Sequence, residues 1–110
     1  NKYCVKHGHY LVSGSAIRFE GQYTVFGNDY NSQPCYECLY KPEDESLEDC
    51  QGNGVLGPIP GTIGAMMATE TIKIICNIHA QNTQLNIYEG IANEWRQINI
   101  KKSNNCSICN

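Results

Sequence analysis

Apolar and polar residues alternate along the first quarter of the chain in the way that β-strands require. Residues 10–12 form a short apolar strand, and further strands are expected over 16–20 and 22–26, where apolar side chains occupy every second position. Gly21 lies between the last two, which predicts either a tight hairpin there or a bulge in one long bent strand. Residues 1–9 look like the end of a helix, since glycine at position 8 is a typical helix terminator.

A long helix is predicted from Pro60 to about Cys76. Proline suits the first helical position, because its missing N–H is not needed there. Apolar residues then surround the helix axis, and only Glu70 and Lys73 are charged. Such a helix is buried on more than one side. The strands of this chain can cover only one side, so we expect the isolated chain to expose a large apolar patch.

Two more strands are expected over 84–89 and 94–101, with a turn between them. The order of strands, helix and strands within 110 residues indicates one α/β domain at most. The chain begins at Asn1 rather than at methionine, and a helix end with nothing before it is unusual for a domain. We therefore expect a fragment of a longer chain.

Composition and charge exclude several classes of protein. A hydrophobic fraction of 41% with 17% charged residues excludes an intrinsically disordered chain. A net charge of −3 argues against a general nucleic-acid binder, which carries a basic face. No apolar stretch approaches the ~18 residues of a membrane span, and no signal peptide is visible.

Seven cysteines are present, and four of them form two Cys-x-x-Cys pairs, Cys35 with Cys38 and Cys106 with Cys109. Each pair presents two sulfurs from one tight turn, and two pairs together complete a tetrahedral four-thiolate site. This pattern predicts a closed, structural zinc site in a reducing compartment. Rubredoxin-type iron uses similar ligands, so the spacing leaves the metal open. Two unrelated redox dithiols are the alternative interpretation.

Several segments together resemble the MoeB/ThiF-type adenylyltransferases, relatives of the ubiquitin-activating enzymes. The similarity covers nearly the whole chain, in order. It is carried by the strand segment 11–26, the cysteine turn 35–40, the Gly- and Pro-rich helix entry with its helix over 54–73, and the closing turn 105–109.

The resemblance implies an α/β fold, the C-terminal half of a Rossmann-like ubiquitin-activating-enzyme-type fold. Its strands are mainly antiparallel, with one long buried helix and a four-cysteine zinc site; residues 1–110 form the C-terminal part of a single adenylyltransferase domain. It also implies ATP-dependent adenylylation of the C-terminal glycine of a ubiquitin-like sulfur-carrier protein by a cytoplasmic homodimer, with no nucleic-acid or membrane partner. ATP and magnesium are expected only with the family's nucleotide-binding half, whose motifs are absent here. This chain would supply the zinc site, a crossover loop and the carrier-side sheet, and is expected to be inactive alone.

Cys50 matches the position at which some members of this family carry a thiol for sulfur transfer. Glu48 and Asp49 beside it disfavour a thiolate, and an unused loop thiol in a solvated acidic segment is the simpler interpretation. A free-standing zinc-binding interaction module remains the alternative function, and a thiol redox protein the third.

The remaining candidate residues have structural interpretations. Cys4 and Cys76 are expected to be small buried apolar residues. Arg18 is expected to be an exposed strand charge, and Trp95 to pack on the last strands. The histidines are expected at the surface or at helix ends; they are His7, His9 and His79.

Overall fold

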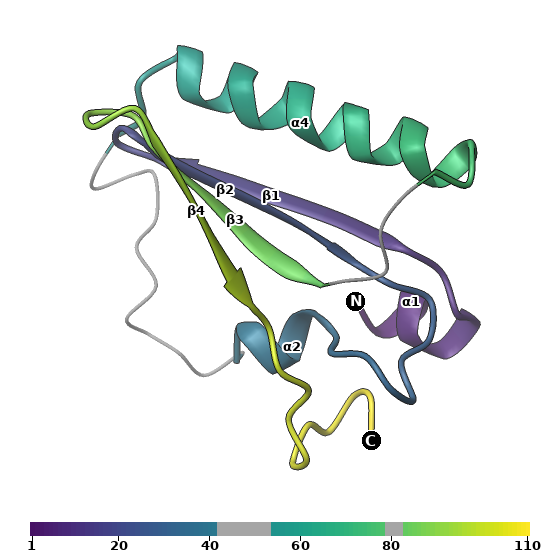
Figure 1. Cartoon of the computed structure of the whole chain (residues 1–110). Coiled ribbons are helices and arrows are strands. Elements are labelled where there is room, and N and C mark those ends of the chain that lie inside the picture. Colours follow the sequence, from purple (N-terminus) through teal and green to yellow (C-terminus); the bar gives the residue numbers. More distant parts are fainter. Residues whose placement is uncertain (42–53, 79–82) are drawn as a thin grey trace.

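The computed structural model describes residues 1–41, 54–78 and 83–110, and these form a four-stranded antiparallel sheet with one long helix across it (Figure 1). The α/β class and the antiparallel strands are as expected. Neighbouring strands in the sheet follow chain order. The strands are β1 (Leu11–Ile17), β2 (Glu20–Phe26), β3 (Gln84–Glu89) and β4 (Glu94–Asn99), and the helices are α1 (Lys2–His7), α2 (Tyr36–Leu39) and α4 (Pro58–Ile75).

The first hairpin turns earlier than the sequence predicted. Residues 11–12 and 16–17 belong to one strand, β1, which pairs with β2 from Leu11 opposite Phe26 to Ile17 opposite Glu20. The turn therefore lies at Arg18, not at Gly21, and Arg18 is not a strand residue. Its backbone has a positive φ of 53° and exchanges hydrogen bonds with residues 54 and 56, at 2.9 and 2.8 Å. A partner segment distant in sequence thus determines this turn, which local alternation could not reveal.

Gly21 has a packing role instead. A Cβ atom at Gly21 would overlap the Ile63 side chain of α4, and one at Gly14 on β1 would overlap Met67 and Ile63. The two glycines let the helix approach the sheet closely. The absence of side chains at these two positions lets α4 pack directly against β1 and β2.

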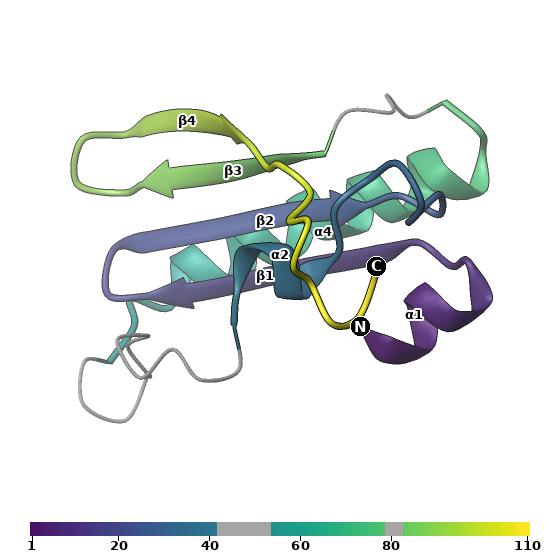
Figure 2. The same cartoon turned by 90° about the horizontal axis from the view of Figure 1, so that it is seen from below.

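The two faces of β2 belong to different cores, as the period-two geometry of a strand requires. Tyr23 points toward α4 and forms a buried cluster with Ile59 and Ile63. Phe26 points to the opposite face, where α2 lies, and is fully buried in a second cluster with Tyr30 and two cysteines. Figure 2 shows α2 and the C-terminal segment on that face, with α4 behind the sheet.

The long helix is confirmed, and among residues 1–41, 54–78 and 83–110 the sheet packs against one of its faces. It begins at Pro58, two residues before the predicted start, and only Ile59 and Ile63 are buried. Farther along, Ile72 and Ile75 are 59% and 74% exposed. Two large apolar side chains of α4 are thus exposed, and the large apolar patch on the isolated chain stays a prediction. Among the described residues, no helix is long and apolar enough to cross a membrane.

Both ends of the chain contact α2, on the sheet face opposite α4 (Figure 2). Helix α1 ends at Gly8, which adopts the left-handed conformation as predicted. Strand β4 ends at Asn99, two residues before its predicted end. The segment after β4 then crosses the face that α2 occupies, which brings the last residues to the first cysteine pair.

Candidate metal centre

The first cysteine pair stands on a single helical turn. Cys35 is the N-cap of α2 and Cys38 lies within it, so one turn of backbone separates the two thiols. The turn is held against the sheet by Tyr36, whose ring meets that of Phe26 edge-on at 6.1 Å between centroids. The fully buried Phe26 therefore determines where the first pair sits.

The second pair reaches the first from the C-terminal segment. The Sγ atoms of Cys35 and Cys106 lie 3.6 Å apart, and those of Cys38 and Cys109 lie 3.5 Å apart. All four sulfurs lie within 4.8 Å of one another. These distances are too long for disulfide bonds. They are close to the separation of about 3.8 Å between ligands in a tetrahedron with metal–sulfur bonds of about 2.3 Å.

Each Cys-x-x-Cys turn also points backbone N–H groups at the sulfur of its first cysteine. The N–H groups of Glu37 and Cys38 act to lower the pKa of the Cys35 thiol, which burial raises. Those of Ile108 and Cys109 act to lower the pKa of the Cys106 thiol in the same way. Donors aimed at sulfur favour the thiolate, which is the form that binds metal. The two turns are thus built alike although they lie 71 residues apart.

Three of the thiols, Cys35, Cys106 and Cys109, have shifted pKa values. Burial raises the pKa of Cys35, and it raises that of Cys109 to about 12. Burial also acts to raise the pKa of Cys106, but the N–H groups of Cys109 and Ile108, together with the neighbouring thiols, bring it down to about 7. A metal ion arriving here must displace protons from the buried thiols.

Hydrogen bonds from neighbouring side chains support the cysteine turns. Asn1 donates to the Cys35 sulfur at 3.5 Å and accepts from the Tyr36 N–H at 3.1 Å, so it braces the start of α2. The N–H of Ser103 donates to the Cys38 sulfur at 3.4 Å. Lys102 donates to the carbonyl oxygens of Tyr30 and Cys109, at 2.6 and 2.7 Å. No sequence pattern distinguished these three residues, because their roles depend on the path of the C-terminal segment.

The structure therefore brings together the four cysteines that the spacing selected, and their arrangement can hold a metal ion. With four protein ligands, such a centre leaves no position for substrate, and its role would be structural. Cys50 and His79 lie outside the described residues. The other two described cysteines differ from expectation: Cys4 is half-buried, and Cys76, which directly follows α4, is exposed.

Two aromatic groups lie away from the metal centre. His7 and His9 lie at the surface near Tyr3, as expected for helix-end histidines. The ring centroids of the two histidines are 6.1 Å apart. Trp95 packs on the last strands as predicted, with its ring 4.9 Å from that of Tyr88.

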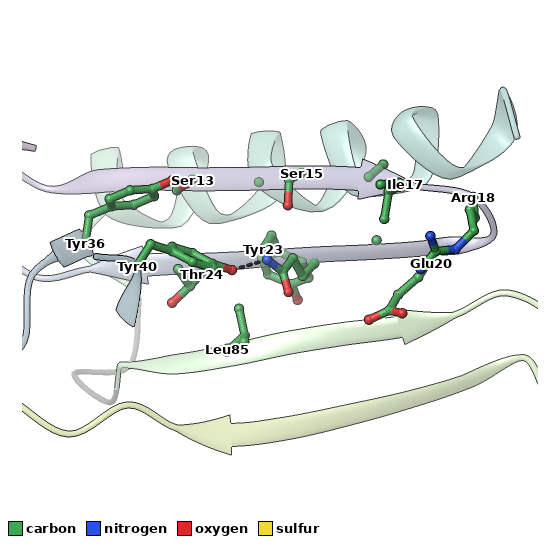
Figure 3. Close-up of a pocket in the computed structure, with 14 residues that line it drawn as sticks. Ser13, Ser15, Ile17, Arg18, Glu20, Tyr23, Thr24, Tyr36, Tyr40 and Leu85 are labelled. Carbon is green, nitrogen blue, oxygen red and sulfur yellow. Dashed lines mark hydrogen bonds between the residues drawn. The ribbon is translucent and has the colours of Figure 1, made fainter. Parts of the chain in front are cut away.

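A cavity of about 490 Å³ lies on the sheet face opposite α4, between the strands and α2 (Figure 3). Ser15 on β1 points into it, and the Tyr40 ring after α2 closes one side, with its hydroxyl hydrogen-bonded to Gln22. Burial, and then the neighbouring Tyr36, raise the pKa of Tyr40, so its hydroxyl stays neutral. Arg18 and Glu20 stand at the far end of the cavity, where β1 turns into β2. The face thus offers hydroxyl groups and small side chains along its length and charges at one end.

The amino-acid sequence of this chain is similar to one protein family and to several characterised proteins. Residues 1–108 match the ThiF family. The protein named adenylyltransferase and sulfurtransferase MOCS3 is 41% identical over 114 residues in Dictyostelium discoideum, a match that covers 99% of this chain and 26% of the relative. The Xenopus laevis protein of the same name is 39% identical over 113 residues, covering 99% and 25%. The chain thus spans about a quarter of the length of these relatives.

Solved structures agree in fold. Escherichia coli MccB with MccA-N7isoASN has a TM-score of 0.75 at 17% identity, covering 99% of this chain and 36% of that one. MccB with ATP has a TM-score of 0.74 at 18% identity, covering 100% and 34%. At this level of identity the likeness concerns the fold alone.

Proposed function

This chain belongs to the ThiF family, and on that premise we propose that it forms part of an ATP-dependent adenylyltransferase acting on the C-terminal glycine of a ubiquitin-like sulfur-carrier protein. The observation that carries the proposal is the identity of about 41% with proteins named adenylyltransferase and sulfurtransferase, over 99% of this chain. Residues 1–110 would be the C-terminal part of one adenylyltransferase domain in a cytoplasmic homodimer. ATP and magnesium would be held by other residues of the enzyme.

In this proposal the four-cysteine centre holds a structural zinc ion through Cys35, Cys38, Cys106 and Cys109. The distances between the sulfurs and the N–H groups aimed at them support a tetrahedral thiolate site. The ion supplies cross-linking between two segments rather than chemistry on a substrate. It would keep the C-terminal segment against α2, beside the sheet face that carries the cavity. Metal analysis distinguishes zinc from iron directly.

The sheet face opposite α4 is proposed as the carrier-side surface. It carries a cavity of about 490 Å³ that is lined in part by side-chain hydroxyl and amide groups. Such groups can hydrogen-bond to the backbone of an extended polypeptide tail. Cys50, in the proposed crossover loop, would be the thiol that reaches the carrier during sulfur transfer. A full-length enzyme with Cys50→Ala that transfers sulfur at an undiminished rate would remove that role from the proposal.

The activity is tested by ATP–pyrophosphate exchange with the full-length protein and candidate sulfur carriers. We expect exchange that depends on the carrier's C-terminal glycine, and none from the 110-residue chain alone. Ser15→Arg should raise the KM for the carrier at least about tenfold without changing that for ATP, because it fills the cavity. Ile91→Arg, at an exposed position in the β3–β4 turn, is the matched control.

Native mass spectrometry of the full-length protein distinguishes this enzyme from the alternative, a free-standing zinc-binding interaction module. An adenylyltransferase should show one zinc per chain in a dimer together with carrier-dependent exchange. One zinc on a monomer that binds protein partners but performs no exchange would favour the interaction module.

A further inference from the structure

Lys102 is the charged side chain that the C-terminal segment places against the cysteine centre. Its ammonium group donates to the Tyr30 carbonyl oxygen at 2.6 Å and to the Cys109 carbonyl oxygen at 2.7 Å. Burial raises the pKa of the Cys109 thiol, and the nearby Lys102 ammonium group acts in the opposite direction. Lys102 is half-buried, whereas its neighbour Lys101 is exposed. Nothing in the cysteine spacing or the adenylylation chemistry requires a lysine here.

Tyr30, whose carbonyl oxygen accepts from Lys102, is buried and held in place by its own contacts. Tyr30 is 5% exposed, and its hydroxyl donates to the His9 carbonyl oxygen at 2.7 Å. Tyr30 also belongs to the buried cluster that contains Cys35 and Cys106. By binding Tyr30 and Cys109 together, Lys102 ties the second cysteine turn to the segment that leads into the first one.

The charge of Lys102 has an electrostatic consequence as well. Four thiolates around a divalent ion leave about two net negative charges. Cys35 and Cys106 are buried, at 0% and 8% exposure, and charge that is buried without compensation is costly. The Lys102 ammonium group, held at the Cys109 turn of the same four-thiol cluster, offsets part of that cost. Groups beyond the ligands commonly change metal affinity by about 10- to 100-fold.

We propose that Lys102 is a positioning residue of the metal centre, which fixes the Cys106–Cys109 turn against Tyr30 and offsets the negative charge of the metal-bound thiolates. The inference rests on the proposed four-cysteine metal site. It adds a residue that determines how long the metal is retained.

Zinc release tests the inference on the zinc-loaded full-length protein. A chromophoric chelator in excess reports the release rate for wild type, Lys102→Met, Lys102→Arg and the control Lys101→Met. We expect Lys102→Met to release zinc at least about tenfold faster than wild type. Lys102→Arg should recover most of the difference, because it keeps the charge and the donors. Lys101→Met should match wild type, since Lys101 is exposed.

Cobalt substitution separates the charge from the mechanical tie. Removing a positive charge beside the sulfurs raises the energy of their lone pairs. The thiolate-to-cobalt charge-transfer band of Lys102→Met should therefore move to longer wavelength, and the band of Lys102→Arg should stay near that of wild type. Should Lys102→Met fail to fold, Lys102→Gln gives the same comparison, since it keeps a donor but loses the charge.

Equal release rates for Lys102→Met and Lys101→Met would overturn the inference, and so would an unmoved cobalt band in every charge-removing variant. These outcomes leave the metal site itself standing if wild type contains one zinc per chain. A wild-type protein without bound metal after purification in reducing buffer would instead contradict the proposed site, and the role of Lys102 with it.

Discussion

Among the residues of the metal centre, protons and metal compete for the same sulfur atoms. Burial raises the pKa of Cys35 and of Cys109, so both thiols are protonated at neutral pH before metal binds. Hydrogen bonds to Cys106 bring its pKa down to about 7, so that sulfur is partly ionised already. In the proposed metal site Cys106 would be the first ligand, and Cys35 and Cys109 would lose protons as the metal binds.

This competition predicts the direction of the pH dependence. Zinc affinity should rise with pH, because raised thiol pKa values keep protons on the ligands at low pH. Binding near pH 7.5 should release at least two protons, from Cys35 and Cys109. Titration calorimetry in two buffers of different ionisation enthalpy measures this number. An affinity that does not change between pH 6 and pH 8 would contradict the assignment of thiols as ligands.

Replacing one ligand should release the C-terminal segment. Cys109→Ser is expected to reduce bound zinc to well below one per chain and to lower the melting temperature by at least about 10 °C, since structural zinc sites contribute on the order of 10 kcal/mol. Cys76→Ser is the matched control, because Cys76 is exposed and lies outside the cluster. Unchanged melting and metal content in Cys109→Ser would refute the structural role.

At the scale of elements, the contact between α4 and the sheet depends on one side chain meeting two glycines. Ile63 is 2% exposed and fills the space above Gly14 and Gly21. The two glycines and Ile63 act as a matched set, because any added carbon on the sheet would overlap the helix. This contact sets the distance between the layers, and with it the orientation of the exposed side of α4.

Truncating Ile63 should therefore destabilise the fold strongly. Ile63→Ala is expected to lower the free energy of unfolding by about 2–5 kcal/mol, through lost burial and a cavity over the glycines. Ile75→Ala on the same helix should change it by no more than about 0.5 kcal/mol, since Ile75 is 74% exposed. Urea denaturation of both variants measures the difference. Equal effects would show that α4 does not pack as described.

At the scale of the whole molecule, the chain carries two surfaces of different character. One face of the sheet carries the cysteine centre and the cavity, and α4 lies across the other face (Figure 1). Ile72 and Ile75 of α4 are exposed. Contiguous exposed apolar side chains mark surfaces that other protein segments cover. The chain spans about a quarter of the length of its relatives. In those relatives, the remaining three quarters of the polypeptide are long enough to cover such a surface.

The isolated chain should accordingly behave as an incompletely covered domain. We expect the isolated chain to bind a hydrophobic dye and to self-associate. The double variant Ile72→Lys and Ile75→Lys should reduce both effects without unfolding the chain, because both positions are exposed. In the full-length protein the same pair should lower the melting temperature by several degrees. A full-length protein that tolerates the pair unchanged would show that this side of α4 faces solvent there.

By itself the sequence determined most of the elements and selected the candidate metal ligands. The alternation over 22–26, the small and apolar residues of the long helix and the terminating Gly8 are local signals, and each predicted its element to within a few residues. The four cysteines could be selected because the spacing within each pair is itself local: one turn of backbone presents both sulfurs. Family resemblance carried the functional hypothesis, and the family match agrees with it.

Only the tertiary structure decided where the first hairpin turns, which side of α4 is covered, and which neighbours support the cysteines. Arg18 turns the chain because it pairs with residues 54–56, and Gly21 is needed because Ile63 lies above it. Lys102 and Asn1 act on the cysteines only because the two ends of the chain meet beside α2. Such contacts join residues far apart in sequence, and no periodicity or propensity along the chain records which distant backbone will arrive beside a given side chain.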